Sequence, residues 1–110
     1  MKKINRVKKY REFKQVMNLR KFKRDEFYTV YYREKTLDVA RVGILVGKKN
    51  GNAVTRVKIK RQVRAIIDST LDLKNDSKDY IVVISKNYTT EDFEKNKTLL
   101  VKLLNSIKEN

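Results

Sequence analysis

The sequence contains no cysteine, histidine, tryptophan or proline among its 110 residues, and only three glycines. Without cysteine and histidine it has no disulfide framework, no thiolate or imidazole metal site, and neither side chain that most often activates a nucleophile. No stretch approaches the roughly 18 uninterrupted apolar residues of a membrane span, and no apolar signal-peptide core follows the lysine-rich start. These absences exclude most familiar enzyme chemistries and lead us to expect a cytoplasmic protein.

Basic residues dominate what is present. Lys and Arg number 28 against 13 Asp and Glu, a formal net charge of +15, while 40% of the residues are hydrophobic. That apolar content is enough for a packed core, and the length allows one core only. We therefore expect a single domain over residues 1–110, with residues 1–8 as a flexible basic tail, and a polyanionic partner.

Hydrophobic spacing predicts the order of the elements. Apolar residues three and four apart predict a short helix over residues 10–19, and aromatic and β-branched residues predict a strand over residues 27–32. We expect a second strand within residues 38–49 to form a hairpin with the first. Gly51 supplies a sharp turn and Asn52 a cap for a long helix over residues 53–71.

The last third of the chain predicts a strand and a helix. Residues 80–84 are continuously apolar, which is typical of a central strand. Thr89 and Thr90 provide a hydroxyl cap for a final helix that begins with acidic residues. The fold class is therefore an α/β (α+β) two-layer sandwich, a small mixed sheet of three to four strands with covering helices, in the order α-β-β-(β)-α-β-α.

The long helix and the turn before it carry the strongest charge pattern. Seven basic residues and no acid lie between Lys48 and Arg64, and Arg56, Lys60 and Arg64 ascend at four-residue intervals. A solvated helix usually mixes charges of both signs, so this pattern favours RNA or DNA over simple solvation. A membrane surface is the weaker alternative, because the apolar side of the helix is needed to cover the sheet.

Other candidate sites are less specific. Aromatic residues beside basic ones can be core residues or stacking platforms for unpaired bases, and for the individual aromatics both interpretations stay open. Asp68 and Asp72 lie one helical turn apart, but nothing around them supplies further ligands. We assign no catalytic residue and no metal ligand.

The segment from Lys48 to Arg64, KKNGNAVTRVKIKRQVR, resembles the signature of the bacterial ribonuclease P protein component. Its surroundings are similar to the same family: RVGI at residues 41–44, EFKQV at residues 12–16 and DYIVV at residues 79–83. The resemblance covers nearly the whole chain.

The resemblance implies a protein subunit that assists a catalytic RNA in removing the 5′ leader from precursor tRNA, with the RNA carrying out the hydrolysis and using magnesium. The expected partners are ribonuclease P RNA and precursor tRNA, with no DNA and no membrane, and no cofactor is expected on the protein. The resemblance assigns catalytic-RNA binding to Lys48, Lys49, Asn52, Arg56, Lys58, Lys60, Arg61 and Arg64. It assigns a leader-binding cleft to Phe13, Met17, Tyr28, Val30 and Tyr32.

The family also implies a left-handed crossover from strand through basic helix to strand, against the usual right-handed rule, and the fold of the second domain of the small-subunit ribosomal protein five. Three positions depart from the family pattern. Val57 and Lys58 stand where the family has Asn and Arg, and Met17 stands where it has a second aromatic residue.

Two alternatives come from other classes of protein. A ribosomal protein or general RNA-binding module has a similar composition, and only the motif from Lys48 to Arg64 argues against it. A DNA-binding helix-turn-helix protein ranks last, because the basic helix lacks a partner helix to brace it across the backbone.

Overall fold

The computed structural model describes residues 1–108. Its elements are η1 (Lys3–Asn5), α1 (Tyr10–Asn18), β1 (Phe22–Arg24), β2 (Tyr28–Glu34), β3 (Val42–Leu45), η2 (Lys48–Asn50), α2 (Ala53–Thr70), β4 (Lys78–Ile84) and α3 (Phe93–Lys108). This α+β order confirms the predicted sequence of elements, and β1 is the optional short strand.

The four strands form one mixed sheet in the order β1-β2-β4-β3. β4 is central, as its continuous apolar sequence predicts. It pairs antiparallel with β2, in a register that places Val30 opposite Val82, and parallel with β3, in a register that places Ile44 opposite Val82.

The predicted hairpin between the strands at residues 27–32 and 38–49, which correspond to β2 and β3, is wrong. β2 forms its hairpin with β1, where Phe22 lies opposite Tyr31, and β3 lies on the far side of β4. The physical reason is that β4 is apolar toward both faces, so it takes the central place between β2 and β3.

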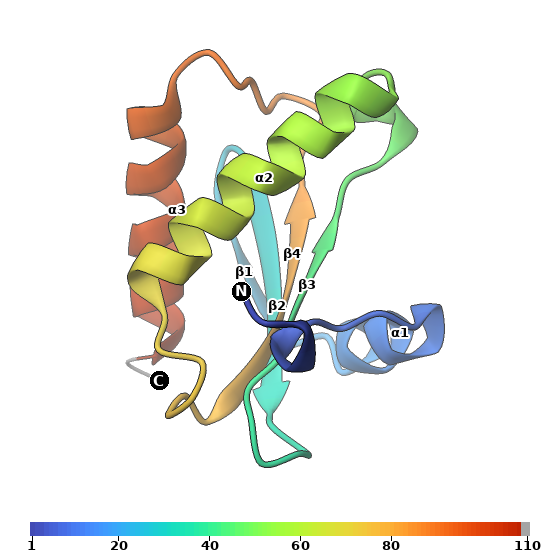
Figure 1. Ribbon diagram of the computed structural model, residues 1–110, viewed down its shortest axis with the longest axis vertical. Helices are drawn as coiled ribbons and strands as arrows, with labels where there is room; N and C mark the ends of the chain where they lie inside the picture. The colour runs from blue at the N-terminus through green and yellow to red at the C-terminus, as the bar shows by residue number, and fades with distance from the viewer. Residues whose placement is uncertain (109–110) are drawn as a thin grey trace.

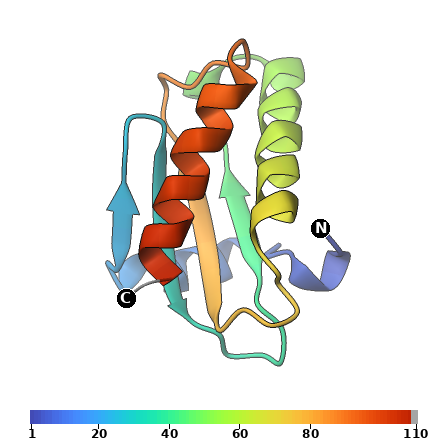
Figure 2. The ribbon, with the colours of Figure 1, turned by 90° about the vertical axis from the view of Figure 1, so that its left-hand side faces the viewer.

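The helices divide between the two faces of the sheet (Figures 1 and 2). α2 and α3 cover one face over the main core, which includes Tyr28, Val30, Tyr80, Val82 and Ile84. α1 crosses the other face, where Val7, Phe13 and Val16 pack against Ile81. The predicted two-layer sandwich therefore gains a short third layer, which leaves part of the second face open.

The start of the chain does not form the expected flexible tail. Val7 is buried, its backbone N–H donates to Val42 O at 3.0 Å, and Arg6 forms a parallel bridge with Val42. Asn5 is also buried and donates from Nδ2 to Ala40 O at 2.9 Å. This segment packs because Val7 has an apolar partner surface and β3 offers an unpaired edge.

The cap of the last helix also differs from the prediction. α3 begins at Phe93, and Asp92 Oδ1 accepts the backbone N–H of Lys95 at 3.1 Å. Thr89 Oγ1 instead accepts from the backbone N–H of Glu91 in the preceding turn. A carboxylate caps as well as a hydroxyl does and adds favourable charge at the helix start, which explains the shift.

Candidate nucleic-acid interface

The basic helix α2 starts from a turn that its own residues fix. Gly51 has φ 117°, a conformation that side-chain-bearing residues rarely adopt. Asn52 follows as the helix cap, and its Oδ1 accepts the backbone N–H of Thr55 at 2.9 Å. Asn50 holds the turn to the sheet, because its Nδ2 donates to Ser85 O at 2.8 Å beyond the end of β4. Sequence reasoning identified Gly51 and Asn52 but missed Asn50.

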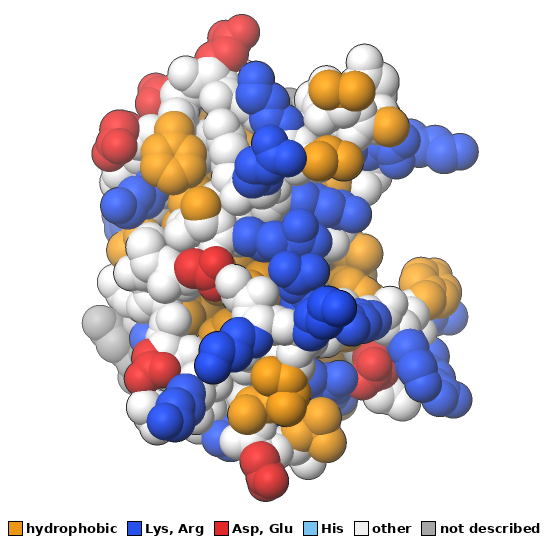
Figure 3. All heavy atoms as spheres, in the orientation of Figure 1, with side chains coloured by type: hydrophobic (Ala, Val, Ile, Leu, Met, Phe, Trp, Pro, Cys, Tyr) orange, Lys and Arg blue, Asp and Glu red, His pale blue; other side chains and the backbone are white. Residues whose placement is uncertain are grey.

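One side of α2 is buried and the rest is basic. Ile59, Val63, Ile66 and Ile67 pack into the main core. The basic residues are exposed or half-buried, and within residues 1–108 none of them forms an ion pair. Lys and Arg side chains gather along α2 in Figure 3. The surface predicted from Lys48, Lys49, Asn52, Arg56, Lys58, Lys60, Arg61 and Arg64 is thus accessible and uncompensated.

The orientation of α2 is fixed by its one uncharged amide side chain. Gln62 donates from Nε2 to Thr90 O at 3.0 Å and accepts at Oε1 from the Tyr88 hydroxyl at 2.8 Å. Asn96 Nδ2 also points to Gln62 Oε1, at 3.3 Å. Burial raises the pKa of the Tyr88 hydroxyl, which keeps it a donor. Sequence reasoning missed Gln62, because one amide between basic residues gives no periodic signal.

A second candidate surface is the open part of the sheet beside α1. Met17, Tyr31, Leu45 and Val83 are half-buried there around Phe13. Phe22 on β1 extends this surface, with its ring centroid 5.2 Å from that of Tyr31. The Arg24 guanidinium lies 5.6 Å from the Phe22 ring centroid, a cation–π arrangement. Aromatic and basic groups therefore share one accessible face.

Three of the five residues predicted for the cleft lie on the opposite face. Tyr28 is 1% exposed and Val30 is fully buried, and Tyr32 packs against the same core beneath α2 and α3. The Tyr28 hydroxyl donates to Asn96 O at 2.9 Å, and burial raises its pKa above the ordinary range. The structure thus corrects the assignment of Tyr28, Val30 and Tyr32 to a cleft beside α1.

Phe13 and Met17 do lie beside the open sheet face. Phe13 is 9% exposed, and its ring occupies the space above Gly43 on β3. A Cβ on Gly43 would come within 2.7 Å of Phe13 Cζ. The missing side chain at Gly43 therefore lets α1 approach the sheet, a role that the sequence did not reveal.

The carboxylates do not form a further site. Asp72 accepts from Asn75 Nδ2 at 2.7 Å, and residues 1–108 contain no group of three or more potential metal ligands. Within the same residues, no helix has the length and apolar character needed to cross a membrane.

Comparison with known proteins agrees with the fold. The family described as Ribonuclease P matches residues 1–108. The chain is 40% identical over 109 residues to the ribonuclease P protein component of Enterococcus faecalis, covering 98% of this chain and 92% of that one. It is 35% identical over 109 residues to the component of Mycoplasma capricolum, covering 98% and 100%. The structure of the Staphylococcus aureus RNase P protein matches with a TM-score of 0.83 at 29% identity, covering 94% of this chain and 95% of that one. The chain therefore belongs to the family of bacterial ribonuclease P protein components, the protein subunits of an endoribonuclease that processes tRNA.

Proposed function

We propose that this subunit holds the catalytic RNA along α2 and the single-stranded 5′ leader of precursor tRNA across the open sheet face. The observation that carries the proposal is the adjacency of the two surfaces: an uncompensated basic helix and an aromatic sheet face on either side of β3. The RNA carries out the hydrolysis and uses magnesium, and the protein contributes position and charge.

Contacts to the catalytic RNA come from the turn and the exposed part of α2. The guanidinium groups of Arg56, Arg61 and Arg64 can each hold two phosphate oxygens, and the lysines add point charge. Asn52 uses its carbonyl oxygen as the helix cap, so its contribution to RNA is the amide nitrogen. The full set is Lys48, Lys49, Asn52, Arg56, Lys58, Lys60, Arg61 and Arg64.

The leader surface consists of Phe13 and Met17 on α1 with Tyr31 on β2 and Phe22 on β1. Phe22 is 39% exposed and stands beside Tyr31, so unpaired bases can stack there without sequence-specific hydrogen bonds. Arg24 lies over the Phe22 ring and supplies charge for the adjoining phosphates. Met17 packs against a base through its flexible thioether rather than by stacking.

We infer a left-handed crossover from β3 through α2 to β4. The parallel strands both run upward in Figure 2, with α2 and α3 in front of the sheet and β4 to the left of β3. The opposite hand would place β4 to the right. This arrangement supports the topology that the family resemblance implies.

The mechanism that follows is electrostatic. A subunit with net charge +15 reduces repulsion between the catalytic RNA and its substrate, so less magnesium is needed for the same degree of screening. Its partners are then ribonuclease P RNA and precursor tRNA in the cytoplasm, rather than DNA or a membrane.

The experiment is multiple-turnover cleavage of a precursor tRNA by a bacterial ribonuclease P RNA at low magnesium, with and without this protein. The proposal predicts cleavage at the mature 5′ end that depends on the protein and is replaced by RNA-only cleavage at high magnesium. Binding to the RNA without any gain in cleavage would contradict the proposal and would favour a general RNA-binding role.

A further inference from the structure

The edge of β3 carries a cavity that lies between the two proposed RNA surfaces and shares Lys60, Arg64 and Phe13 with them. β3 is the last strand of the sheet, and Arg6 bridges only its first residue, Val42. Beyond that bridge, the N-terminal segment, the strand edge and α2 border an open cavity of about 370 Å³. This volume is within the range of pockets that hold small organic ligands. In Figure 3 the surface is hollowed on the side between α2 and α1.

Cationic side chains converge on this cavity from two segments that are distant in sequence. Arg6 and Lys8 come from the N-terminal segment, and Lys60 and Arg64 come from α2. The lining contains no acidic residue, and within residues 1–108 none of these four cations forms an ion pair. Four uncompensated cations around one small volume favour an anionic ligand.

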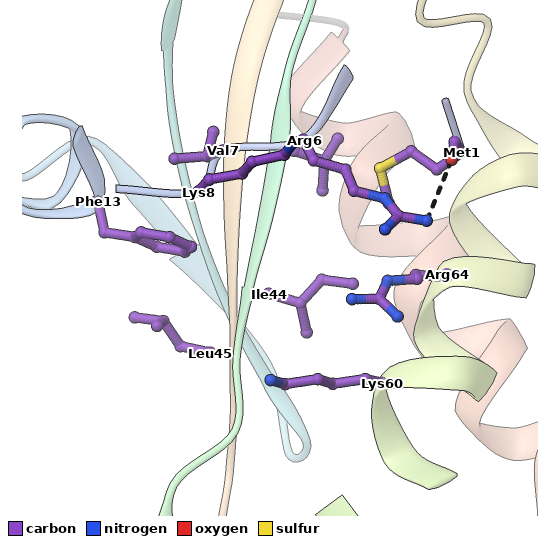
Figure 4. A pocket seen from close by; sticks show the side chains of 10 residues that line it. Met1, Arg6, Val7, Lys8, Phe13, Ile44, Leu45, Lys60 and Arg64 are labelled. Carbon is purple, nitrogen blue, oxygen red and sulfur yellow. Dashed lines mark hydrogen bonds between the residues drawn. The ribbon is translucent and has the colours of Figure 1, made fainter. Parts of the chain in front are cut away.

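The guanidinium of Arg6 has hydrogen-bond donors beside the cavity that the protein does not fully satisfy. Its Nη2 donates to Met1 O at 3.3 Å, which is a long bond, and its Nε is buried with no partner. A buried donor without an acceptor is costly, so a shift of the Arg6 side chain that places its guanidinium on a ligand oxygen would be stabilised. Lys60 and Arg64 extend from α2 toward Ile44 beneath Arg6 (Figure 4).

The rest of the cavity is apolar. Ile44 faces α2, while Phe13 and Leu45 lie on the other side of β3, toward the open sheet face (Figure 4). Free phosphate would leave these apolar groups without a partner, whereas a nucleotide offers both a phosphate and a flat apolar base.

We propose that this cavity binds one nucleotide of a single-stranded RNA. Its phosphate lies among Arg6, Lys60 and Arg64, and its base rests on Ile44 and on the apolar groups around the strand edge. The inference rests on the proposed function, because it gives the RNA a continuous path from α2 around β3 to the sheet face. It adds Arg6, from the N-terminal segment, to the residues that hold RNA.

The first test uses the isolated full chain and three small probes: uridine monophosphate, uridine and inorganic phosphate. Titrations followed by NMR at Arg6 Nε and the Ile44 methyl groups give a Kd for each probe. The proposal predicts that the nucleotide binds about tenfold or more tightly than either fragment. Equal affinities for nucleotide and phosphate would overturn it, because the apolar wall would then contribute nothing.

Charge-matched variants separate the cavity from general attraction. Arg6→Gln and Arg11→Gln each remove one positive charge, but Arg11 is exposed on α1 and does not line the cavity. Arg6→Gln should weaken nucleotide binding about tenfold and Arg11→Gln much less. Equal losses would overturn the proposal. If Arg6→Gln loosens the N-terminal segment, Lys60→Gln tests the same cavity from α2. Lys60→Gln should also weaken nucleotide binding.

The holoenzyme identifies the source of the nucleotide. A loss in Arg6→Gln confined to substrates with a long leader assigns the nucleotide to the leader, and a loss in assembly with the catalytic RNA assigns it to that RNA. Both outcomes support the site, and wild-type affinity for both RNAs overturns it. Failure of the proposed function would instead appear in the wild-type cleavage assay.

Discussion

Arg41, immediately before β3, donates from Nη2 to Glu12 Oε2 on α1 at 2.6 Å, and this ion pair joins the helix to the start of the edge strand beside the proposed leader surface. Glu12 is the only acid among residues 1–24, and both side chains are largely buried, at 24% exposed for Glu12 and 11% for Arg41. The Arg41 guanidinium lowers the pKa of the Glu12 carboxyl. This ion pair therefore holds α1 over the sheet together with the packing of Phe13 and Val16 against Ile81.

Glu12→Gln should loosen α1 while leaving α2 unchanged. We expect the free energy of unfolding to fall by about 1 to 2 kcal/mol, because a charge-assisted hydrogen bond is lost. Affinity for leader-bearing substrate should fall several-fold, with no change in catalytic-RNA binding. Glu34→Gln removes the same charge from an exposed position without an ion pair and is the control for chemical denaturation and binding.

The same pair predicts a dependence on pH. The pKa of Glu12 is lowered in the folded protein from an ordinary value of 4.5. Its contribution is therefore complete above that value and is lost as the pH falls through the folded-state pKa. The difference in unfolding free energy between wild type and Glu12→Gln should be constant near neutral pH and shrink in acid. A difference that persists in strong acid would assign the stabilisation to packing.

Gly43→Ala should push α1 away from the sheet. The new Cβ would meet Phe13 Cζ at 2.7 Å and Ile81 Cδ1 at 2.9 Å, so the ring must move. Overpacking of this kind costs about 1 to 3 kcal/mol, and leader affinity should fall with it. Gly47→Ala is the matched control, because nothing lies within 4 Å of its added Cβ. Equal thermal unfolding of both variants would contradict the close approach.

Substitutions at Tyr31 and Tyr28 should affect different properties, leader affinity in the first case and stability in the second. Tyr31→Leu removes a ring from the open face, so we expect about a tenfold loss of leader affinity with near-normal stability. Tyr28→Leu removes a buried ring and its hydrogen bond to Asn96 O, so unfolding should be easier while the folded protein keeps its leader affinity. The reverse pattern would restore the leader assignment that the structure corrects.

Arg56→Ala combined with Arg64→Ala should weaken catalytic-RNA binding more than folding. Affinity falls as salt rises, and each lost phosphate contact makes the slope of log affinity against log salt shallower by about one. The double variant should therefore make the slope shallower by about two. Lys97→Ala with Lys102→Ala removes the same charge from exposed positions on α3. An equal change of slope in that control would contradict the prediction, because it would show that the RNA responds only to the net charge of the protein.

Periodicity identified the helices and the central strand, because burial imposes spacing on local sequence. The pairing of the strands could not be predicted from local sequence in the same way. The chain crosses from β2 past β4 to β3 through a connection whose sequence carries no signal for the sheet edge it reaches. Alternation likewise separated Tyr28 from Tyr31, but only the position of α1 shows which of them faces the open side.

The basic helix was predictable because like charge without compensation is visible in sequence. The residues that position it were not, since Asn50 and Gln62 act through hydrogen bonds to residues distant in sequence, among them Ser85 and Thr90. The role proposed for Arg6 could not be predicted either, because it depends on the N-terminal segment and α2 lining the same cavity.

Site-specific cross-linking tests the division between the two RNA surfaces most directly. The chain has no cysteine, so Thr29→Cys on the open sheet face, Val57→Cys on α2 and Asn105→Cys on α3 each create one attachment point for a photoreactive benzophenone. In the holoenzyme with bound substrate, the label at position 29 should cross-link to the leader and that at position 57 to the catalytic RNA. The label at position 105 should reach neither. Leader cross-links from position 57 or 105 with none from position 29 would contradict the account.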